Sequence, residues 1–174
     1  MRTFSDIAKH TALIFALLTV AAPSFAETPA ADGTAPPPQT VGEKQRCPVC
    51  GMYPARYPLW QVQVIFRDRG MVAIESPAEF LRYRAEMKRY DTTHRSEDIA
   101  QVYFSDHAGS GWIRAEQAAF VEGSDAKGPM GADSPAFRQK QDAEQFARQH
   151  GGKVIAFDAL PGDHGTGHHH HTEH

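Results

Sequence analysis

The chain has 174 residues, with 18 lysines and arginines against 21 aspartates and glutamates, and a formal net charge of −3 at pH 7. This length suits one compact domain or two very small ones. No basic cluster is available to neutralise phosphates, so the composition argues against a nucleic-acid partner.

The first 26 residues are predicted to be a secretory signal peptide. Arg2 and Lys9 flank the start of the segment, and the apolar run 11–22 is followed by Ser24-Phe25-Ala26, whose small residues suit cleavage after Ala26. The apolar run is shorter than the ~20 residues that a membrane span needs. The segment has no twin arginine and no cysteine for lipid attachment. We therefore expect an exported protein without a lipid anchor.

Residues 27–46 are predicted to form a linker. They are rich in alanine and proline, and Val41 is their only large apolar residue. Such a segment buries too little surface to offset the entropy lost on ordering. We expect a flexible tether here, followed by a folded domain over residues 47–160.

The first half of this domain is predicted to have the order β-β-α-β. Apolar and polar residues alternate over 60–67, which indicates a half-buried strand, and a turn leads into a return strand over 71–75. The sequence Ser76-Pro77-Ala78-Glu79 is a capping box with proline at the first helical position. A helix is predicted from there to about Tyr90, and a third strand over 101–104.

The second half of the domain is predicted to repeat this order. Strand-like segments at 112–113 and 119–121 precede a glycine-rich passage over 123–131. A helix over 142–150 ends at paired glycines, and a final strand lies within 153–158. The pattern predicts an α+β fold built from two similar β-β-α-β units.

The stretch Cys47-Pro48-Val49-Cys50-Gly51-Met52 holds both cysteines of the chain and a methionine. Thiolate and thioether sulfurs together select Cu(I) over hard cations. The alternative is a disulfide, because thiols in an oxidising compartment tend to pair. A loop this short, however, would constrain the unfolded chain very little. Met130 in the glycine-rich passage offers another sulfur, with packing against the core as its alternative role.

A C-x-x-C motif is also typical of thiol–disulfide oxidoreductases. In those enzymes the motif begins a helix, which lowers the pKa of the thiol. Here Gly51, Pro54 and Pro58 would interrupt such a helix. A structural zinc site would need a second Cys/His pair inside the domain. We rank the oxidoreductase second and zinc third.

The remaining candidate ligands are histidines. His94 and His107 lie in predicted loops and are expected to be solvated, with His107 as the reserve nitrogen ligand. Residues 161–174 form a predicted flexible tail whose histidines are His164, His168, His169, His170, His171 and His174. Such tracts bind Cu(II), Zn(II) or Ni(II) at modest affinity. We expect an auxiliary metal-collecting tail, with a purification tag as the alternative origin.

The order of these motifs resembles the NosL family. The resemblance is carried by the 47–52 motif followed by Tyr-Pro, the capped helix, the passage Gly-Ser-Asp…Gly-Pro-Met-Gly and the closing His-Gly-Gly-Lys, and it covers nearly all of 47–158. It implies a pair of β-β-α-β units and a periplasmic Cu(I)-binding accessory protein that helps to mature the copper centres of nitrous oxide reductase. Family members commonly carry a lipid anchor, from which this sequence departs.

With this resemblance, metal ligation becomes the favoured interpretation of the cysteines. No Ser-His-Asp arrangement, phosphate loop or catalytic carboxylate pair stands out, so we predict a metallochaperone and not an enzyme. The predicted Cu(I) ligands are Cys47, Cys50, Met52 and Met130. The predicted partner is apo nitrous oxide reductase or another copper-dependent periplasmic enzyme. Copper storage or scavenging stays as an alternative function.

Overall fold

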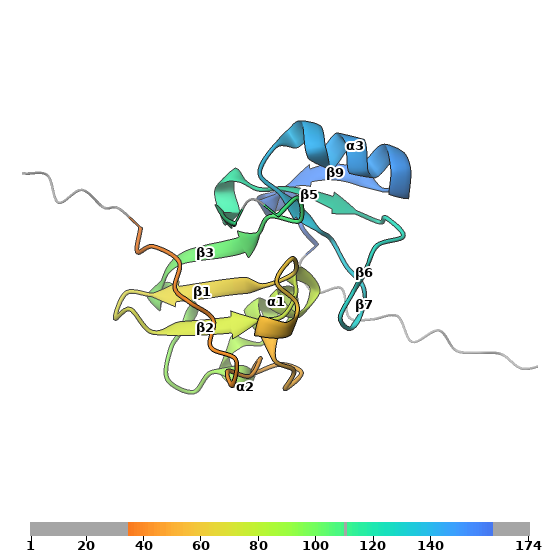
Figure 1. Cartoon of the computed structure of the whole chain (residues 1–174). Coiled ribbons are helices and arrows are strands. Elements are labelled where there is room, and N and C mark those ends of the chain that lie inside the picture. The colour runs from red at the N-terminus through yellow and green to blue at the C-terminus, as the bar shows by residue number, and fades with distance from the viewer. Residues whose placement is uncertain (1–34, 110, 162–174) are drawn as a thin grey trace, which may run out of the picture. The chain divides into compact units, whose positions relative to one another are not determined.

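The computed structural model describes residues 35–109 and 111–161, which form two antiparallel sheets, a two-stranded hairpin and three α-helices (Figure 1). The predicted signal peptide and the histidine-rich tail lie outside the described residues. Within these two ranges, no helix combines the length and the apolar character that crossing a membrane requires.

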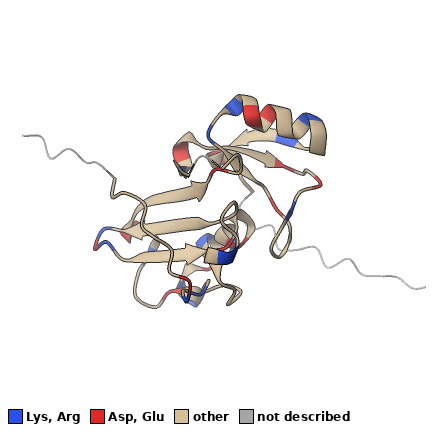
Figure 2. Ribbon diagram, in the orientation of Figure 1, with Lys and Arg blue, Asp and Glu red and all other residues tan. Residues whose placement is uncertain are grey.

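The first sheet has the strand order β2-β1-β3-β4. Its strands are β1 (Val62–Phe66), β2 (Met71–Ile74), β3 (Ile99–Ser105) and β4 (Trp112–Arg114). The helices α1 (Pro77–Ala85) and α2 (Met87–Tyr90) connect β2 to β3. Figure 2 shows that these strands carry few charged residues, which gather instead on the helices and connections.

The second sheet has the order β8-β5-β9. Its strands are β5 (Ala119–Glu122), β8 (Ala136–Phe137) and β9 (Lys153–Ala156), with helix α3 (Lys140–His150) between β8 and β9. A hairpin of β6 (Lys127–Gly128) and β7 (Gly131–Ala132) interrupts the connection from β5 to β8. Short 3-10 helices complete the described chain: η1 (Pro54–Arg56), η2 (Ser96–Asp98), η3 (Ala115–Gln117) and η4 (Phe157–Ala159).

The predicted α+β fold of two similar units is confirmed. In each unit the first strand lies between the second and the third, as the orders β2-β1-β3 and β8-β5-β9 show. One strand was assigned to the wrong unit, and one strand was missed. The segment 112–113 was assigned to the second unit, but it lies in β4 and pairs with β3 of the first sheet. The strand that takes its place, β8, has only two residues, which is too short to show an alternating pattern.

The helix predicted to run to Tyr90 is divided at Glu86. Its backbone there has φ −120° and ψ 40°, which is not helical, so α1 ends and the shorter α2 begins. Ser76 is the N-cap residue as predicted, with its side chain 3.5 Å from the backbone N–H of Glu79, and Pro77 follows it. We find no sequence signal that marks the break at Glu86.

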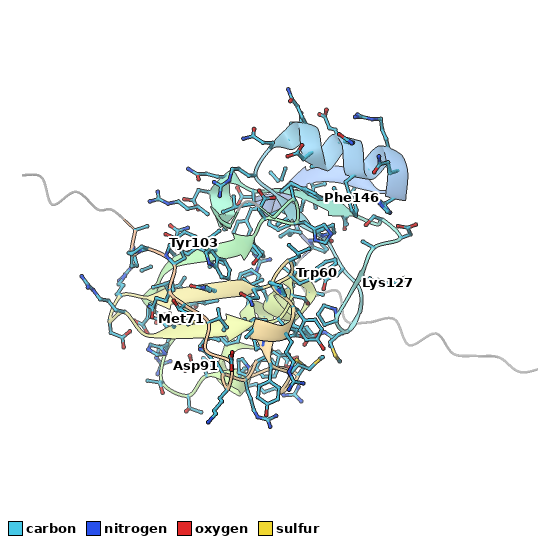
Figure 3. The ribbon with its side chains drawn as sticks, in the orientation of Figure 1. Trp60, Met71, Asp91, Tyr103, Lys127 and Phe146 are labelled. Atoms are coloured by element: carbon cyan, nitrogen blue, oxygen red, sulfur yellow. The ribbon has the colours of Figure 1, made fainter. Side chains whose placement is uncertain are left out.

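Strand β1 is buried along its whole length and not half-buried as the alternation indicated. Its second face is covered by part of the predicted linker. Gln63 explains why: its side-chain amide donates to the carbonyl of Gln39 at 2.6 Å, and its Oε1 accepts the Gln39 N–H at 2.8 Å. The Tyr103 hydroxyl donates to the carbonyl of Pro36 at 2.8 Å (Figure 3). The segment 35–46 is therefore bound to the sheet, contrary to the free tether predicted from composition.

One aromatic cluster joins the two units. The ring of Phe104, from β3, lies 5.3 Å from Phe80 of α1, 4.8 Å from Phe120 of β5 and 5.9 Å from Phe157 of η4. Phe104 and Phe120 are fully buried. The two sheets therefore share a hydrophobic core.

His94 is half-buried, in contrast to the solvated position predicted for it. Its ring stacks on Phe66 with centroids 3.8 Å apart. Its Nδ1 lies 3.1 Å from Asp91 and its Nε2 3.1 Å from Asp68. Burial opposes a positive charge on His94, but the hydrogen bonds with the two carboxylates outweigh it and raise the pKa of the imidazole. The pKa values of Asp68 and Asp91 are lowered, with backbone N–H donors contributing to both shifts.

This arrangement predicts a pH-dependent contribution to stability. A group whose pKa is raised by folding stabilises the native state below its unfolded pKa, about 6.5 for histidine, and this stabilisation is lost as the pH rises through the folded pKa. We expect His94→Asn to lower the free energy of unfolding more at pH 5.5 than at pH 8.5, measured by urea denaturation. Lys88→Gln, which removes an exposed positive charge nearby in the chain, is the control. An equal loss at both pH values would contradict a charged His94.

Candidate metal centre

The 47–52 motif forms a closed loop that is not the start of a helix. The Cys47 N–H donates to the carbonyl of Met52 at 2.8 Å, and the Gly51 N–H donates to the carbonyl of Cys47 at 2.9 Å. Gly51 has φ 75°, a left-handed conformation that glycine adopts without a steric penalty. The next helical residues begin only at Pro54. Gly51 and Pro54 therefore keep the cysteine motif from starting a helix, as predicted from the sequence.

The loop surrounds its two sulfurs with backbone donors. The N–H groups of Cys50 and Val49 hydrogen-bond to the sulfur of Cys47, and the N–H of Met52 to the sulfur of Cys50. Hydrogen bonds of this kind favour the thiolate over the thiol. Cys47 is 1% exposed and Cys50 is half-buried, and both are free thiols. The loop thus presents one buried and one accessible sulfur as potential ligands.

Glu75 is the residue of this site that the sequence analysis missed. One of its carboxylate oxygens and the sulfurs of Cys47 and Cys50 all lie within 4.8 Å of one another. It directly follows β2 and precedes Ser76, the N-cap of α1, so the turn from strand to helix places it beside the loop. The available signal was a single acidic residue at the end of an apolar strand, which we assigned only to the return strand.

The Glu75 carboxylate is fully inaccessible to solvent. Among residues 35–109 and 111–161, no N–H or O–H group donates a hydrogen bond to either of its oxygens. Glu79, equally buried, differs because its Oε1 lies 2.9 Å from a guanidinium nitrogen of Arg82, although outside hydrogen-bond geometry. An ionised carboxylate buried without a cation is costly. A cation held by the two neighbouring sulfurs would offset this cost, so the donor set fits a metal ion.

The surroundings favour protonated thiols in the absence of a metal. Burial, followed by the closeness of the Glu75 carboxylate, raises the pKa of both Cys47 and Cys50. The backbone donors lower both pKa values but do not outweigh these effects. Oxidoreductase thiols need the opposite shift, because the thiolate is the nucleophile. A metal ion bound by this dithiol would have to displace the same protons.

Replacing the Glu75 carboxyl group by an amide should make the thiols more reactive. We expect Glu75→Gln to lower the pKa of both cysteines and to speed their alkylation by iodoacetamide at pH 8, by ~10-fold for each pKa unit. The measurement is the rate of mass increase in the metal-free, reduced protein. Glu86→Gln, at an exposed glutamate, should leave the rate unchanged. A slower reaction in Glu75→Gln would show that the carboxylate does not hold the protons on sulfur.

The sequence matches the NosL family over residues 38–164. The chain belongs to the NosL family. The copper-binding lipoprotein NosL of Stutzerimonas stutzeri is 30% identical over 125 residues, and the match covers 71% of this chain and 65% of that relative's length. The crystal structure of the copper chaperone NosL from Shewanella denitrificans matches with a TM-score of 0.62 and 26% identity, covering 72% of this chain and 97% of that one. These matches confirm the resemblance read from the sequence motifs.

The methionines of this NosL chain differ in their surroundings. Met52 is half-buried, and its backbone N–H and carbonyl both belong to the cysteine loop. Met130 lies at the turn between β6 and β7 and is 53% exposed. This exposure agrees with the predicted loop and argues against core packing. Ligation by either methionine stays a prediction, and the six tail histidines lie outside the described residues.

His107 was predicted to be solvated, but its side chain is half-buried. Its half-buried ring lies 4.8 Å from Trp60 of the first unit, 5.7 Å from Phe137 and 5.5 Å from Phe146 of the second (Figure 3). Burial lowers its pKa. The backbone N–H of His107 donates to the carbonyl of Ala136 at 2.8 Å. These contacts give His107 a packing role between the units in this member of the NosL family.

Proposed function

We propose that this chain is an exported Cu(I)-binding metallochaperone. The observation that supports this proposal most directly is the grouping, within the described residues, of two free thiols with the buried carboxylate of Glu75. Two thiolates are soft ligands that suit Cu(I). The two relatives described above, a copper-binding lipoprotein and a copper chaperone, agree with this choice of metal.

In this proposal Cys50 captures the ion and Cys47 secures it. Both thiols lose their protons on binding, because the thiolate is the ligand. Met52 and Met130 add thioether sulfurs, and the charge of Glu75 favours a cation beside the pair. A site with so few ligands leaves copper open to an incoming thiolate or imidazole. Copper then leaves by stepwise ligand exchange, and the protein needs no catalytic group.

We further propose that the recipient is apo nitrous oxide reductase or another copper-dependent periplasmic enzyme. This rests on the family and on the predicted signal peptide, which would direct residues after Ala26 to the periplasm. The test is an anaerobic incubation of the copper-loaded chain with apo nitrous oxide reductase, followed by separation and copper analysis. Transfer of copper at a rate above that from a chelator of equal affinity supports delivery. Retention of copper by the chain would favour storage or a different recipient.

The histidine-rich tail is proposed to collect metal and not to form the tight site. Flexible histidine tracts bind divalent ions at modest affinity. Deleting residues 162–174 should therefore lower the number of Cu(II) or Ni(II) ions bound, while one tight Cu(I) site is kept. Equilibrium dialysis and anaerobic Cu(I) competition measure the two quantities. Loss of the tight Cu(I) site on truncation would contradict this division of roles.

A further inference from the structure

We infer that Asp133 is a positioning residue that fixes the Met130 hairpin against the corner of the chain that carries Glu75. This inference rests on the proposed function, because it concerns how one predicted ligand reaches the cysteine site. Asp133 belongs to the second unit, whereas Glu75 and the cysteine loop belong to the first. The residue is 8% exposed, although it carries a carboxylate.

The Asp133 carboxylate caps the N-terminus of helix α1, although Asp133 is distant from that helix in the sequence. Its Oδ1 accepts the backbone N–H of Ala78 at 2.9 Å and that of Ser134 at 2.8 Å. The Ser76 side chain lies close to this carboxylate as well. The first N–H groups of a helix have no partner within the helix, and a negative charge there is favourable. Asp133 thus fixes the backbone at Ala78. Three residues earlier in this short segment, a carboxylate oxygen of Glu75 lies within 4.8 Å of the two sulfurs.

The same carboxylate lies against the hairpin. A Cβ added to Gly128 in β6 would come within 2.6 Å of Oδ2 of Asp133 and 2.9 Å of its Cβ. Glycine at this position therefore provides the space that the side chain occupies. One oxygen of the carboxylate therefore accepts from the first helix of the first unit, and the other lies where a side chain at Gly128 of the hairpin would stand.

The hairpin needs such an anchor. It contains two residue pairs, Lys127 with Ala132 and Gly128 with Gly131, and a ladder this short is not stable by itself. Met130 at its turn is largely exposed, so its side chain contributes little packing that would hold the hairpin in place. A ligand on an unanchored hairpin would have no defined position relative to the thiols. The geometry therefore assigns that task to Asp133.

The test is whether Met130 responds to copper without this anchor. In the reduced chain with ¹³C-labelled methionine methyl groups, anaerobic Cu(I) addition should shift the Met130 methyl resonance, assigned by its absence in Met130→Leu. Asp133→Ala should abolish that shift and weaken Cu(I) binding by about 10- to 100-fold, the range for residues that position ligands. Asp133→Asn retains an acceptor oxygen for the Ala78 N–H and should keep the shift. Asp125→Ala, at an exposed acid in the same connection, is the matched control.

A double substitution separates positioning from general stability. If Asp133 acts through Met130, Asp133→Ala should add little loss of affinity in the Met130→Leu background. A full additional loss there, or an unchanged Met130 shift in Asp133→Ala, would overturn the inference. If Asp133→Ala does not fold, Gly128→Ala should displace the carboxylate and give the same loss of the methyl shift. Retention of that shift in Gly128→Ala would also overturn it.

The outcomes distinguish this inference from the proposed function. A wild-type chain without a tight Cu(I) site would refute the proposed function itself. A tight site with no Met130 shift would remove Met130 from the ligands and refute the inference, while leaving the cysteine site in place. A Met130 shift that survives loss of Asp133 would refute the inference alone.

Discussion

Cys50→Ser is expected to abolish tight Cu(I) binding. Serine keeps the size of the side chain but replaces a soft thiolate with a hydroxyl that Cu(I) does not favour. Loss of a residue that only orients a ligand can weaken metal binding by up to ~100-fold. Loss of the Cys50 thiolate, a ligand itself, should weaken Cu(I) binding by more than this. Cys47→Ser should also be severe, because Cys47 lies in the core beside the first sheet and its replacement buries a hydroxyl there.

The measurement is anaerobic competition between the reduced protein and a chromogenic Cu(I) chelator. Met130→Leu should weaken binding less than either cysteine variant, because the dithiol remains. Thermal unfolding of each metal-free variant is the control, and Cys50→Ser should unfold close to the wild type because Cys50 is only half-buried. Unchanged affinity in Cys50→Ser would refute the proposed site. Copper held only by the tail would leave the two cysteines as a redox pair or a disulfide.

Phe104→Ala is expected to lower the free energy of unfolding by ~3–5 kcal/mol, as for other large core side chains. The ring is fully buried and contacts aromatic rings from both units, so its loss leaves a cavity where the sheets meet. Urea denaturation of the metal-free, reduced protein gives the comparison. Leu59→Ala, at a side chain that is 43% exposed, should change stability by less than about 0.5 kcal/mol.

The shape of the unfolding curve carries further information. Because the units share one core, wild type and Phe104→Ala should each unfold in a single cooperative transition. Phe104→Leu should lie between the wild type and Phe104→Ala. Two separate transitions in the wild type would mean that each unit is stable by itself, in contradiction to the shared aromatic cluster.

Much of the fold was accessible from the sequence because local signals coincide with the elements. The capping sequence at Ser76 marks the start of α1, and Gly151, with φ 73°, ends α3 as predicted. The position of β4 was not accessible, since strand pairing across sheets depends on contacts distant in the chain. The binding of segment 35–46 was also missed, because it depends on side chains distant in the sequence, among them Gln63 and Tyr103, which hydrogen-bond to a proline-rich sequence.

The candidate site was predictable to the extent that its residues are neighbours in the sequence. Cys47 and Cys50 are three positions apart, and their spacing alone brings the sulfurs together. Glu75 lies 25 residues beyond Cys50, and only the turn from β2 into α1 brings it to the pair. Asp133 was overlooked for the same reason, since its partner in helix α1, Ala78, is 55 positions away in the chain.

The unequal burial of the two sulfurs gives the proposed transfer a direction. Cys47 is sealed in the core, whereas Cys50 is partly open to solvent. An approaching ligand from another protein therefore meets the copper ion on the Cys50 side. Ligand exchange would begin there, with Cys47 retaining the ion until the acceptor has engaged it. Copper would then leave on the Cys50 side, and its bond to the buried Cys47 sulfur would be the last to break.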